Sequence, residues 1–414
     1  MRPIAKSGAA LKTQASRTRP KRQQEAHMNR LASRATISVI AILIAAFAAN
    51  AQMGKTVSVN AGTPEDNALT EIYAAPDGPE KIALLDKFSA DFGKGDLELL
   101  ADQLYASTYL AQKNYAKTYE YAGKALTLDP ENLSTAVTLV HAAEEQGDIA
   151  KIFDAAERAN GILTRFKSSA PPAGMSKENW EMQKQGILRG AQDDISYFQN
   201  ATFNAAYKLT DSKARATYME RFAKDFPDSP YAVNAREQVA FSEEQAQNFP
   251  KMMEAAQAVL AADPKNVDML VLLSDFWSEK GQQLDKAADY AQKAIDILSK
   301  QQKPEGADDA QWQQQVAMQK GLAYSALGEV YVNQTFNVQA VNAFRQATPL
   351  LKSNPTSYAR NQYRLGFTLA KMQKIPEARA ALTEAASIDS PYRALAQQTL
   401  AKIGGGATHT AKKP

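Results

Sequence analysis

Residues 324–347 read YSALGEVYVNQTFNVQAVNAFRQA. The apolar and small residues of this stretch recur three or four positions apart in two groups: Tyr324, Leu327, Gly328 and Tyr331, and then Ala340, Phe344 and Ala347. Residues at this spacing lie on one face of a helix. The stretch therefore predicts two consecutive helices that form a helical hairpin.

The small residues have a packing role in this hairpin. Gly328 lets the neighbouring helix approach closely, and Phe344 is one large side chain between small ones at the crossing point. A second window repeats the spacing with Leu365, Gly366, Leu369, Ala378, Leu382 and Ala385. Both windows resemble the tetratricopeptide repeat, whose period is about 34 residues.

The resemblance implies an all-α fold, a right-handed α-α superhelix or solenoid of stacked helical hairpins. Composition agrees with it, because Ala, Gln, Lys, Glu and Leu crowd the body of the chain and alternating runs of Val, Ile and Thr are scarce after residue 60. One hairpin cannot bury its apolar face alone. We therefore expect the hairpins to stack into a continuous array.

A longer period of 134 residues predicts a tandem duplication. Lys117 and Glu120, for example, return as Lys251 and Glu254. This period is close to four repeats of about 34 residues. The predicted segments are a basic leader with a secretory signal peptide at 1–51, a disordered linker at 52–63, a first repeat unit at 64–213, its tandem duplicate at 214–348, a partial third unit at 349–403 and a disordered tail at 404–414.

The N-terminal pattern predicts export. A basic stretch with Arg30 and Arg34 precedes an uncharged apolar run, and small residues at Ala49 and Ala51 form a signal-peptidase site that predicts Gln52 as the mature start. The apolar run is shorter than the roughly 20 residues of a membrane span. We expect a periplasmic or secreted bacterial protein with no stable membrane insertion after cleavage.

Two alternatives remain for this region. Residues 1–27 fit no ordinary signal, so either Met1 or Met28 is the true start. A retained apolar segment would instead anchor the protein in the inner membrane.

Residue content excludes several functional classes. Nine of the 48 basic residues but only one of the 45 acidic residues precede residue 52, which leaves 39 basic and 44 acidic residues and a net charge of −5. No basic stripe remains to bind nucleic acid. The chain has no cysteine, and His141 is the one histidine outside the leader and the tail. We therefore predict no catalytic residue, no metal site and no cofactor.

The resemblance also implies where partners bind. Tetratricopeptide proteins generally hold ligands along a concave surface, on residues of the first helix of each hairpin that are not packing positions. Carried onto this sequence, that surface comprises His141, Glu144, Phe241, Glu244, Asp275, Asn333, Arg360, Tyr363, Arg364 and Phe367. The predicted groove is acidic in the middle and basic with aromatic residues near its C-terminal end.

Several of these residues have a second, structural interpretation. Arg360 and Arg364, one helical turn apart, form either an anion site or a solvated pair. His141 is either a partner contact or a core-edge residue. Trp180 either seats an elongated loop or contacts a partner.

A cluster of tyrosines is interpreted mainly as core. Tyr105, Tyr109 and Tyr115 occupy repeat-packing positions, whereas Tyr119 and Tyr121 are less constrained.

Together these features predict a non-enzymatic protein–protein interaction scaffold of the bacterial cell envelope that binds protein or peptide partners. One alternative is an accessory subunit that binds a substrate for an envelope enzyme that processes glycan or peptide, which requires at least two converging acids of perturbed pKa. The other is a membrane-anchored form of the scaffold. The partner, the oligomeric state and the binding face stay open.

Overall fold

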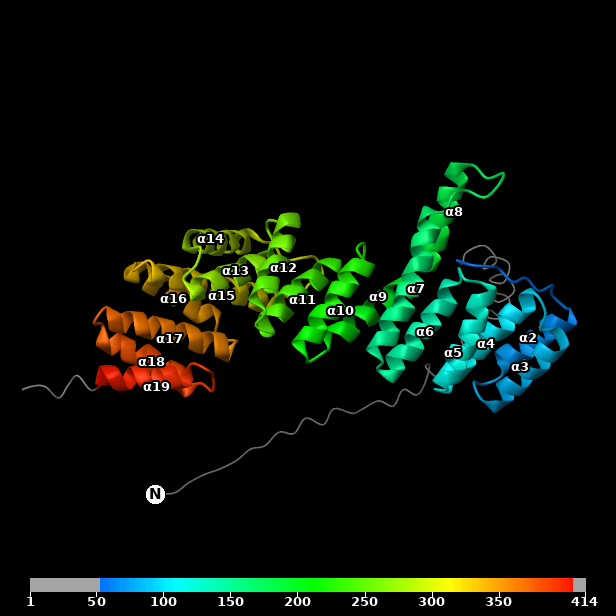
Figure 1. The fold of residues 1–414 in the computed structure, drawn as a ribbon, viewed down its shortest axis with the longest axis horizontal. Coiled ribbons are helices and arrows are strands. Elements are labelled where there is room, and N and C mark those ends of the chain that lie inside the picture. The colour runs from blue at the N-terminus through cyan, green and yellow to red at the C-terminus, as the bar shows by residue number, and fades with distance from the viewer. Residues whose placement is uncertain (1–52, 405–414) are drawn as a thin grey trace, which may run out of the picture. The chain divides into compact units, whose positions relative to one another are not determined.

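The structure, a computed structural model, describes residues 53–404, and within that range it contains helices, turns and irregular segments but no strand (Figure 1). This confirms the predicted all-α fold. The predicted leader and signal peptide, and all but the first residue of the predicted tail, lie outside the described residues.

The described chain forms two compact bodies. Residues 53–146 and 154–198 make the N-terminal body, and residues 147–153 and 199–404 make the C-terminal body. The helices up to the junction are α2 (Pro64–Ala74), α3 (Pro79–Phe92), α4 (Asp96–Ala111), α5 (Tyr115–Leu128), α6 (Leu133–Gln146), α7 (Ile149–Ser168), α8 (Lys177–Gly190) and α9 (Gln192–Tyr207). Two of these, α7 and α9, contribute to both bodies.

The remaining helices belong to the C-terminal body alone. They are α10 (Ser212–Asp225), α11 (Ala232–Gln245), α12 (Phe249–Ala262), α13 (Val267–Lys280), α14 (Leu284–Lys300), α15 (Asp309–Asn333), α16 (Asn337–Leu350), α17 (Pro355–Lys371), α18 (Ile375–Ser387) and α19 (Arg393–Gly404). Consecutive helices pack as hairpins, most extensively α15 with α16 and α17 with α18.

Glycine residues allow the two helices of these hairpins to pack closely against each other. A Cβ atom at Gly328 would lie 2.5 Å from Cε1 of Phe344, and one at Gly366 would lie 2.6 Å from Cγ of Leu382. Such distances are too short for any real contact, so only glycine permits these crossings. The packing role predicted for these glycines is confirmed.

The core of the C-terminal body is centred on α13. This helix contacts α12, α14 and α15, and its side chains are therefore buried around most of its circumference. Trp277 is fully buried, and Leu273 lies one turn before it. A helix covered on so many sides is a rigid support for residues at its remaining exposed edge.

The 134-residue period is visible in the helices. The bounds of α12 and α13 are those of α5 and α6 shifted by 134 residues. The chain changes from one compact body to the other near the start of α7 and again within α9, and the boundary between repeat units after residue 213 stays a prediction. Phe203 in α9 lies 5.5 Å from Phe222 and 5.2 Å from Tyr231, measured between ring centroids, and these contacts hold the end of α9 to the C-terminal body.

Residues 53–63 have no helix, but they make specific contacts. The Met53 side chain is buried, and the Lys55 backbone N–H donates a 2.7 Å hydrogen bond to Oδ2 of Asp129. Val59 packs against the core around Phe88. Single anchoring contacts of this kind carry no periodic signal in the sequence.

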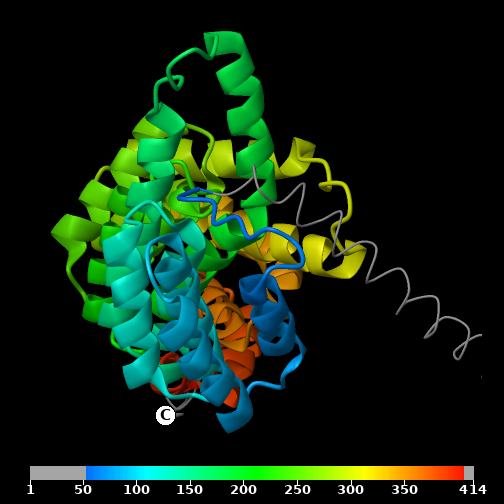
Figure 2. The same cartoon turned by 90° about the vertical axis from the view of Figure 1, so that its right-hand side faces the viewer.

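The loop between α7 and α8 is held by Trp180. The α7–α8 hairpin extends past the other helices of the N-terminal body (Figure 2). The Trp180 indole N–H donates to the Ser169 carbonyl at 3.0 Å, and its ring packs edge-on against Phe166. Lys184 Nζ donates to the same carbonyl at 3.3 Å. The loop-seating interpretation of Trp180 is confirmed.

Candidate functional site: a groove on α11, α13, α15 and α17

The first helices of successive hairpins form a groove in the C-terminal body. This groove has a volume of about 330 Å³. Its lining residues come from α11, α13, α15 and α17 and from the turn before α19: Phe241, Glu244, Asp268, Val271, Leu272, Asp275, Gln319, Leu322, Thr356, Ser357, Arg360 and Tyr392. The groove lies on first-helix residues, as the sequence predicts for a binding surface.

The groove combines an apolar floor with charged walls. Val271 and Leu272 are largely buried in α13, and Phe241 and Leu322 pack against the same core. Such a floor contributes contact area to a partner without requiring a particular hydrogen bond. Specificity must then come from the charged groups on the walls.

Two arginines of α17 form an ion-pair network with acids of α13 and α15. Arg360 Nη1 lies 2.7 Å from Oδ2 of Asp275 and 3.2 Å from Oε1 of Glu279. Arg364 Nη2 lies 2.8 Å from the same Glu279 oxygen, and its Nε lies 3.3 Å from Oε2 of Glu329. Because the partners on each helix are about one turn apart, α13 and α17 face each other in register.

The network is shielded from water. The side chains of Arg360, Arg364 and Asp275 are 15%, 8% and 18% exposed. Burial tends to raise the pKa of Asp275, but Arg360 and Arg364 outweigh it and hold that pKa below its ordinary value. Asp275 is therefore ionised in the folded protein, and the two arginines are neutralised by the chain's own carboxylates.

This pairing changes the interpretation of the two arginines. They are neither a solvated pair nor an open anion site, because Asp275, Glu279 and Glu329 already occupy their guanidinium groups. Their role is to hold the wall of the groove, with α17 fixed against α13 and α15.

Glu244 is the unsatisfied charge of the groove. Among the described residues its carboxylate has no hydrogen-bond or ion-pair partner. Burial raises its pKa, and nearby Asp275 raises it further, while Arg360 partly offsets this. A half-buried carboxylate beside an apolar floor favours a cationic group from outside the chain.

Three other predicted residues lie elsewhere in the C-terminal body. Asn333 is exposed, and its Nδ2 donates to the carbonyls of Ser278 and Glu329, so it links α15 to α13. Tyr363 lies 6.0 Å from both Phe367 and Tyr392, measured between ring centroids. This aromatic group reaches the groove only through Tyr392.

His141 and Glu144 lie in the N-terminal body. The His141 ring stacks on Tyr197 at a centroid distance of 3.7 Å, and the Tyr197 hydroxyl donates to the Glu144 carboxylate. Burial lowers the pKa of His141, although Glu144 opposes this. Both residues therefore have partners within the chain, which is the core-edge interpretation of His141.

Sequence reasoning missed several residues of the groove and of the arginine network. Glu279 and Glu329 complete the arginine network, and Gln319 donates a 2.7 Å hydrogen bond to Asp268. The spacing of Glu279, one turn after Asp275, was an available signal. Tyr392 lies between two helices, where no helical periodicity applies.

Metal binding and membrane insertion are two further properties to consider in the described residues. Between residues 53 and 404 no cluster of three or more histidine, cysteine or acidic side chains is arranged to hold a metal ion. In the same range no helix has the length and apolar character needed to cross a membrane.

Comparisons with known proteins concern the fold. No protein-family profile and no curated protein matches the sequence. Similar solved structures include the APC/C hetero-tetramer Cut9-Hcn1, with 15% identity over 83% of this chain and a TM-score of 0.41, and yeast Tom70, with 11% identity over 93% of this chain and a TM-score of 0.38. A third is NprR in complex with its cognate peptide NprX, with 12% identity over 76% of this chain and a TM-score of 0.35.

These alignments cover 64%, 75% and 86% of the respective solved chains, so this chain spans less than two thirds of the matched chain in the Cut9-Hcn1 structure. The packing of the hairpins defines the class of protein. Helices cross closely at Gly328 and Gly366, and the first helices of successive hairpins line a groove. These features are those of a tetratricopeptide-like helical-repeat protein.

Proposed function

We propose that the protein is a non-enzymatic scaffold that binds a segment of a partner protein in the groove of α11, α13, α15 and α17. The observation that carries this proposal is the unpaired, half-buried carboxylate of Glu244 beside the apolar floor around Leu272. Repeat folds of this kind present extended concave surfaces that suit protein partners.

The charge of the groove favours a basic partner. Glu244 is unpaired, and Asp268 has only the neutral amide of Gln319 as a side-chain hydrogen-bond donor among the described residues. The arginine network adds two positive and three negative charges and so remains acidic. A partner segment with a lysine or arginine next to an apolar side chain would complement both the charge and the floor.

Site-specific photocrosslinking in cells tests the groove. A photoreactive amino acid at Thr356, which is exposed and lines the groove, should capture a partner. The same probe at Val338, which is 59% exposed on α16, is the matched control. Glu244→Lys should abolish the Thr356 adduct because it places a positive charge against a basic partner. Identical adducts at both positions, or an adduct that survives Glu244→Lys, would contradict the proposal.

The cellular location is part of the proposal and depends on residues 28–51, which lie outside the described range. N-terminal sequencing of the mature protein and cell fractionation test it. A start at Gln52 in the periplasmic fraction supports the envelope scaffold. A longer N-terminus in the inner-membrane fraction supports the anchored alternative.

The accessory-subunit alternative has one supporting observation. Glu244 and Asp275 line the same groove, and their pKa values are shifted in opposite directions, a pattern found in acid–base pairs. Both oxygens of Asp275, however, are held by arginines. If the protein is a scaffold, Glu244→Gln and Asp275→Asn should impair partner binding. If these variants instead bind the partner normally but lose a glycan- or peptide-processing activity, the accessory-subunit alternative is favoured.

A further inference from the structure

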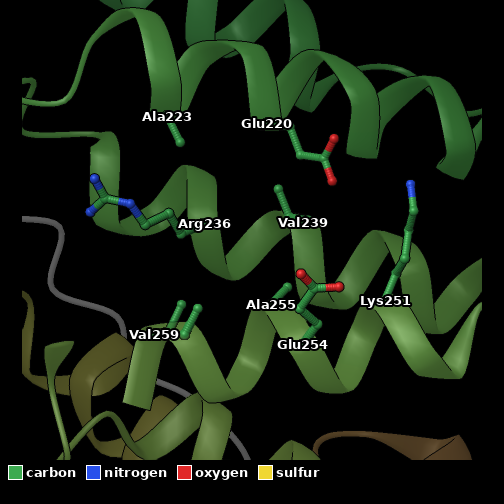
Figure 3. A pocket seen from close by; sticks show the side chains of 9 residues that line it. Glu220, Ala223, Arg236, Val239, Lys251, Glu254, Ala255 and Val259 are labelled. Atoms are coloured by element: carbon green, nitrogen blue, oxygen red, sulfur yellow. The ribbon is translucent and has the colours of Figure 1, made fainter. Parts of the chain in front are cut away.

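A second groove lies between α10 and α12, across α11. It has a volume of about 360 Å³ and is lined by Glu220, Ala223, Arg236, Val239, Lys251, Glu254, Ala255, Ala258 and Val259 (Figure 3). Its α11 residues, Arg236 and Val239, lie on a different face of that helix from Phe241 and Glu244. The two grooves therefore share α11 but no lining residue.

The second groove has a small-residue interior and charged edges. Val239 and Val259 are buried at its base, and alanines from α10 and α12 line its sides. Glu220, Arg236 and Glu254 have no ion-pair or hydrogen-bond partner among residues 53–404. Two unpaired carboxylates and one unpaired guanidinium group thus surround the apolar interior of the second groove.

The same surface in the duplicated segment is filled by the chain's own side chains. The residues 134 positions earlier include Tyr105, Tyr121 and Lys124, where the second groove has Val239, Ala255 and Ala258. The Tyr105 and Tyr121 rings stack at a centroid distance of 4.4 Å. Three larger side chains therefore fill the surface that three small ones leave open in the C-terminal body.

The filled surface of the N-terminal body also shows which polar group a tyrosine contacts at this position of the repeat. The Tyr105 hydroxyl donates a 2.6 Å hydrogen bond to Oδ1 of Asp86, and Glu220 stands at the position of Asp86. The edge acid is therefore retained in the second groove, while the tyrosine that binds it is absent.

One charge beside the tyrosines is reversed in the second groove, and its counter-charge is absent. In the N-terminal body Lys124 partly offsets the charge of buried Asp102. Arg236 stands at the position of Asp102, and Ala258 at that of Lys124. A positive charge therefore stands where the duplicate has a negative one, and because Arg236 has no ion-pair partner among residues 53–404, the group that would neutralise it is a carboxylate.

We propose that the groove between α10 and α12 is a docking site for a partner protein that inserts a tyrosine next to an acidic residue. The tyrosine ring packs on Val239 and Ala255, and its hydroxyl donates to Glu220. The acidic side chain pairs with Arg236. Residues 1–52 and 405–414 contain no tyrosine, so neither of these two segments supplies the occupant.

Binding of a short probe peptide tests this site directly. The probe is the capped heptapeptide Gly-Gly-Tyr-Gly-Asp-Gly-Gly, and the readout is the NMR shift of ¹³C-labelled alanine methyl groups in the whole protein. Saturable shifts are expected at Ala223, Ala255 and Ala258. Replacing the peptide tyrosine by phenylalanine should weaken binding about fivefold, because the hydrogen bond to Glu220 is lost. Replacing it by alanine should abolish binding.

Protein variants assign the two polar contacts. Glu220→Gln replaces a charged acceptor by a weaker neutral one and should narrow the affinity difference between the tyrosine and phenylalanine peptides. Arg236→Gln should remove the preference for aspartate over asparagine in the probe. Ala255→Tyr combined with Ala258→Lys introduces two of the three larger side chains of the duplicate, and this filled variant should abolish binding without lowering the thermal unfolding midpoint.

Three results would overturn the proposal. Equal binding of the tyrosine and alanine probes would remove the aromatic specificity, and unchanged binding to the filled variant would place the probe elsewhere. Self-association that depends on Glu220 would make a second copy of this chain the occupant. If the filled variant does not fold, the affinities of Glu220→Gln for the tyrosine and phenylalanine peptides still test the proposal. Thr356 crosslinking should stay normal in Glu220→Gln, so a failure of this proposal is distinguishable from a failure of the first groove.

Discussion

Arg360 on α17 and Asp275 on α13 are 85 residues apart in the sequence, and their side chains form a 2.7 Å ion pair. The same two helices are joined again through Arg364 and Glu279. Helices of separate hairpins are thus fixed to each other by charges as well as by apolar packing. The groove between them is consequently formed before any partner binds, which lowers the entropic cost of binding.

The network should be important for stability. Asp275→Asn leaves two shielded guanidinium groups with one carboxylate fewer, and we expect it to lower the free energy of unfolding by about 2–3 kcal/mol. Urea unfolding followed by tryptophan fluorescence measures this. The matched control is Glu377→Gln, which breaks the exposed pair of Arg345 and Glu377 and should cost less than about 1 kcal/mol. Equal effects of the two substitutions would contradict a special role for Asp275.

Partner binding in the first groove should depend on pH through Glu244. Its raised pKa means that the carboxylate becomes protonated at a higher pH than the ordinary value of 4.5, so affinity for a basic partner falls as the pH decreases towards that pKa. We expect the yield of the Thr356 crosslink to drop about five- to tenfold between pH 7.5 and the acidic side of the transition. In Glu244→Gln the yield should be low at every pH, and a parallel decrease in that variant would assign the effect to another group.

The fold could be predicted from local patterns because hairpin packing is encoded within about 34 residues. The spacing of Leu327, Gly328 and Phe344 is an example, because it indicates which faces of the two helices pack against each other. Residues 53–63, for which the sequence shows no periodic apolar face, make a contact that local patterns do not signal: Lys55 and Asp129 are 74 positions apart. No periodic pattern encodes such a contact.

The groove was predictable only in part. The sequence placed Phe241, Glu244, Asp275 and Arg360 on one surface, and the structure brings these four together. Whether Arg360 meets Asp275 depends on how hairpins stack across three repeats, which spacing within one helix does not determine. That is why the arginines were interpreted as free.

The glycine at a helix crossing should be irreplaceable. Gly328→Ala puts a methyl group 2.5 Å from the ring of Phe344, so the hairpin must open, and we expect a loss of about 2–4 kcal/mol. Gly186→Ala on α8 is the control, because no atom lies within 4 Å of its added Cβ. That change should stabilise α8 by up to about 1 kcal/mol through helix propensity. Thermal unfolding compares the two, and a stable Gly328→Ala protein would show that the crossing can relax.

Asp102 should make stability depend on pH in the opposite sense to a salt-bridged acid. Burial raises the pKa of Asp102 from 3.8 to about 6, Lys124 partly offsets this, and Glu98 and Glu120 add to it. Because the folded protein holds this proton more tightly than the unfolded chain, the contribution to stability is present below about pH 4 and is lost as the pH rises to about 6. Asp102→Asn should therefore raise the free energy of unfolding at pH 8 by about 1–2 kcal/mol and leave it unchanged at pH 3.5. Asp228→Asn, in the exposed loop after α10, should have no effect at either pH. Equal stabilisation by Asp102→Asn at both pH values would show that packing, and not the buried charge, is responsible.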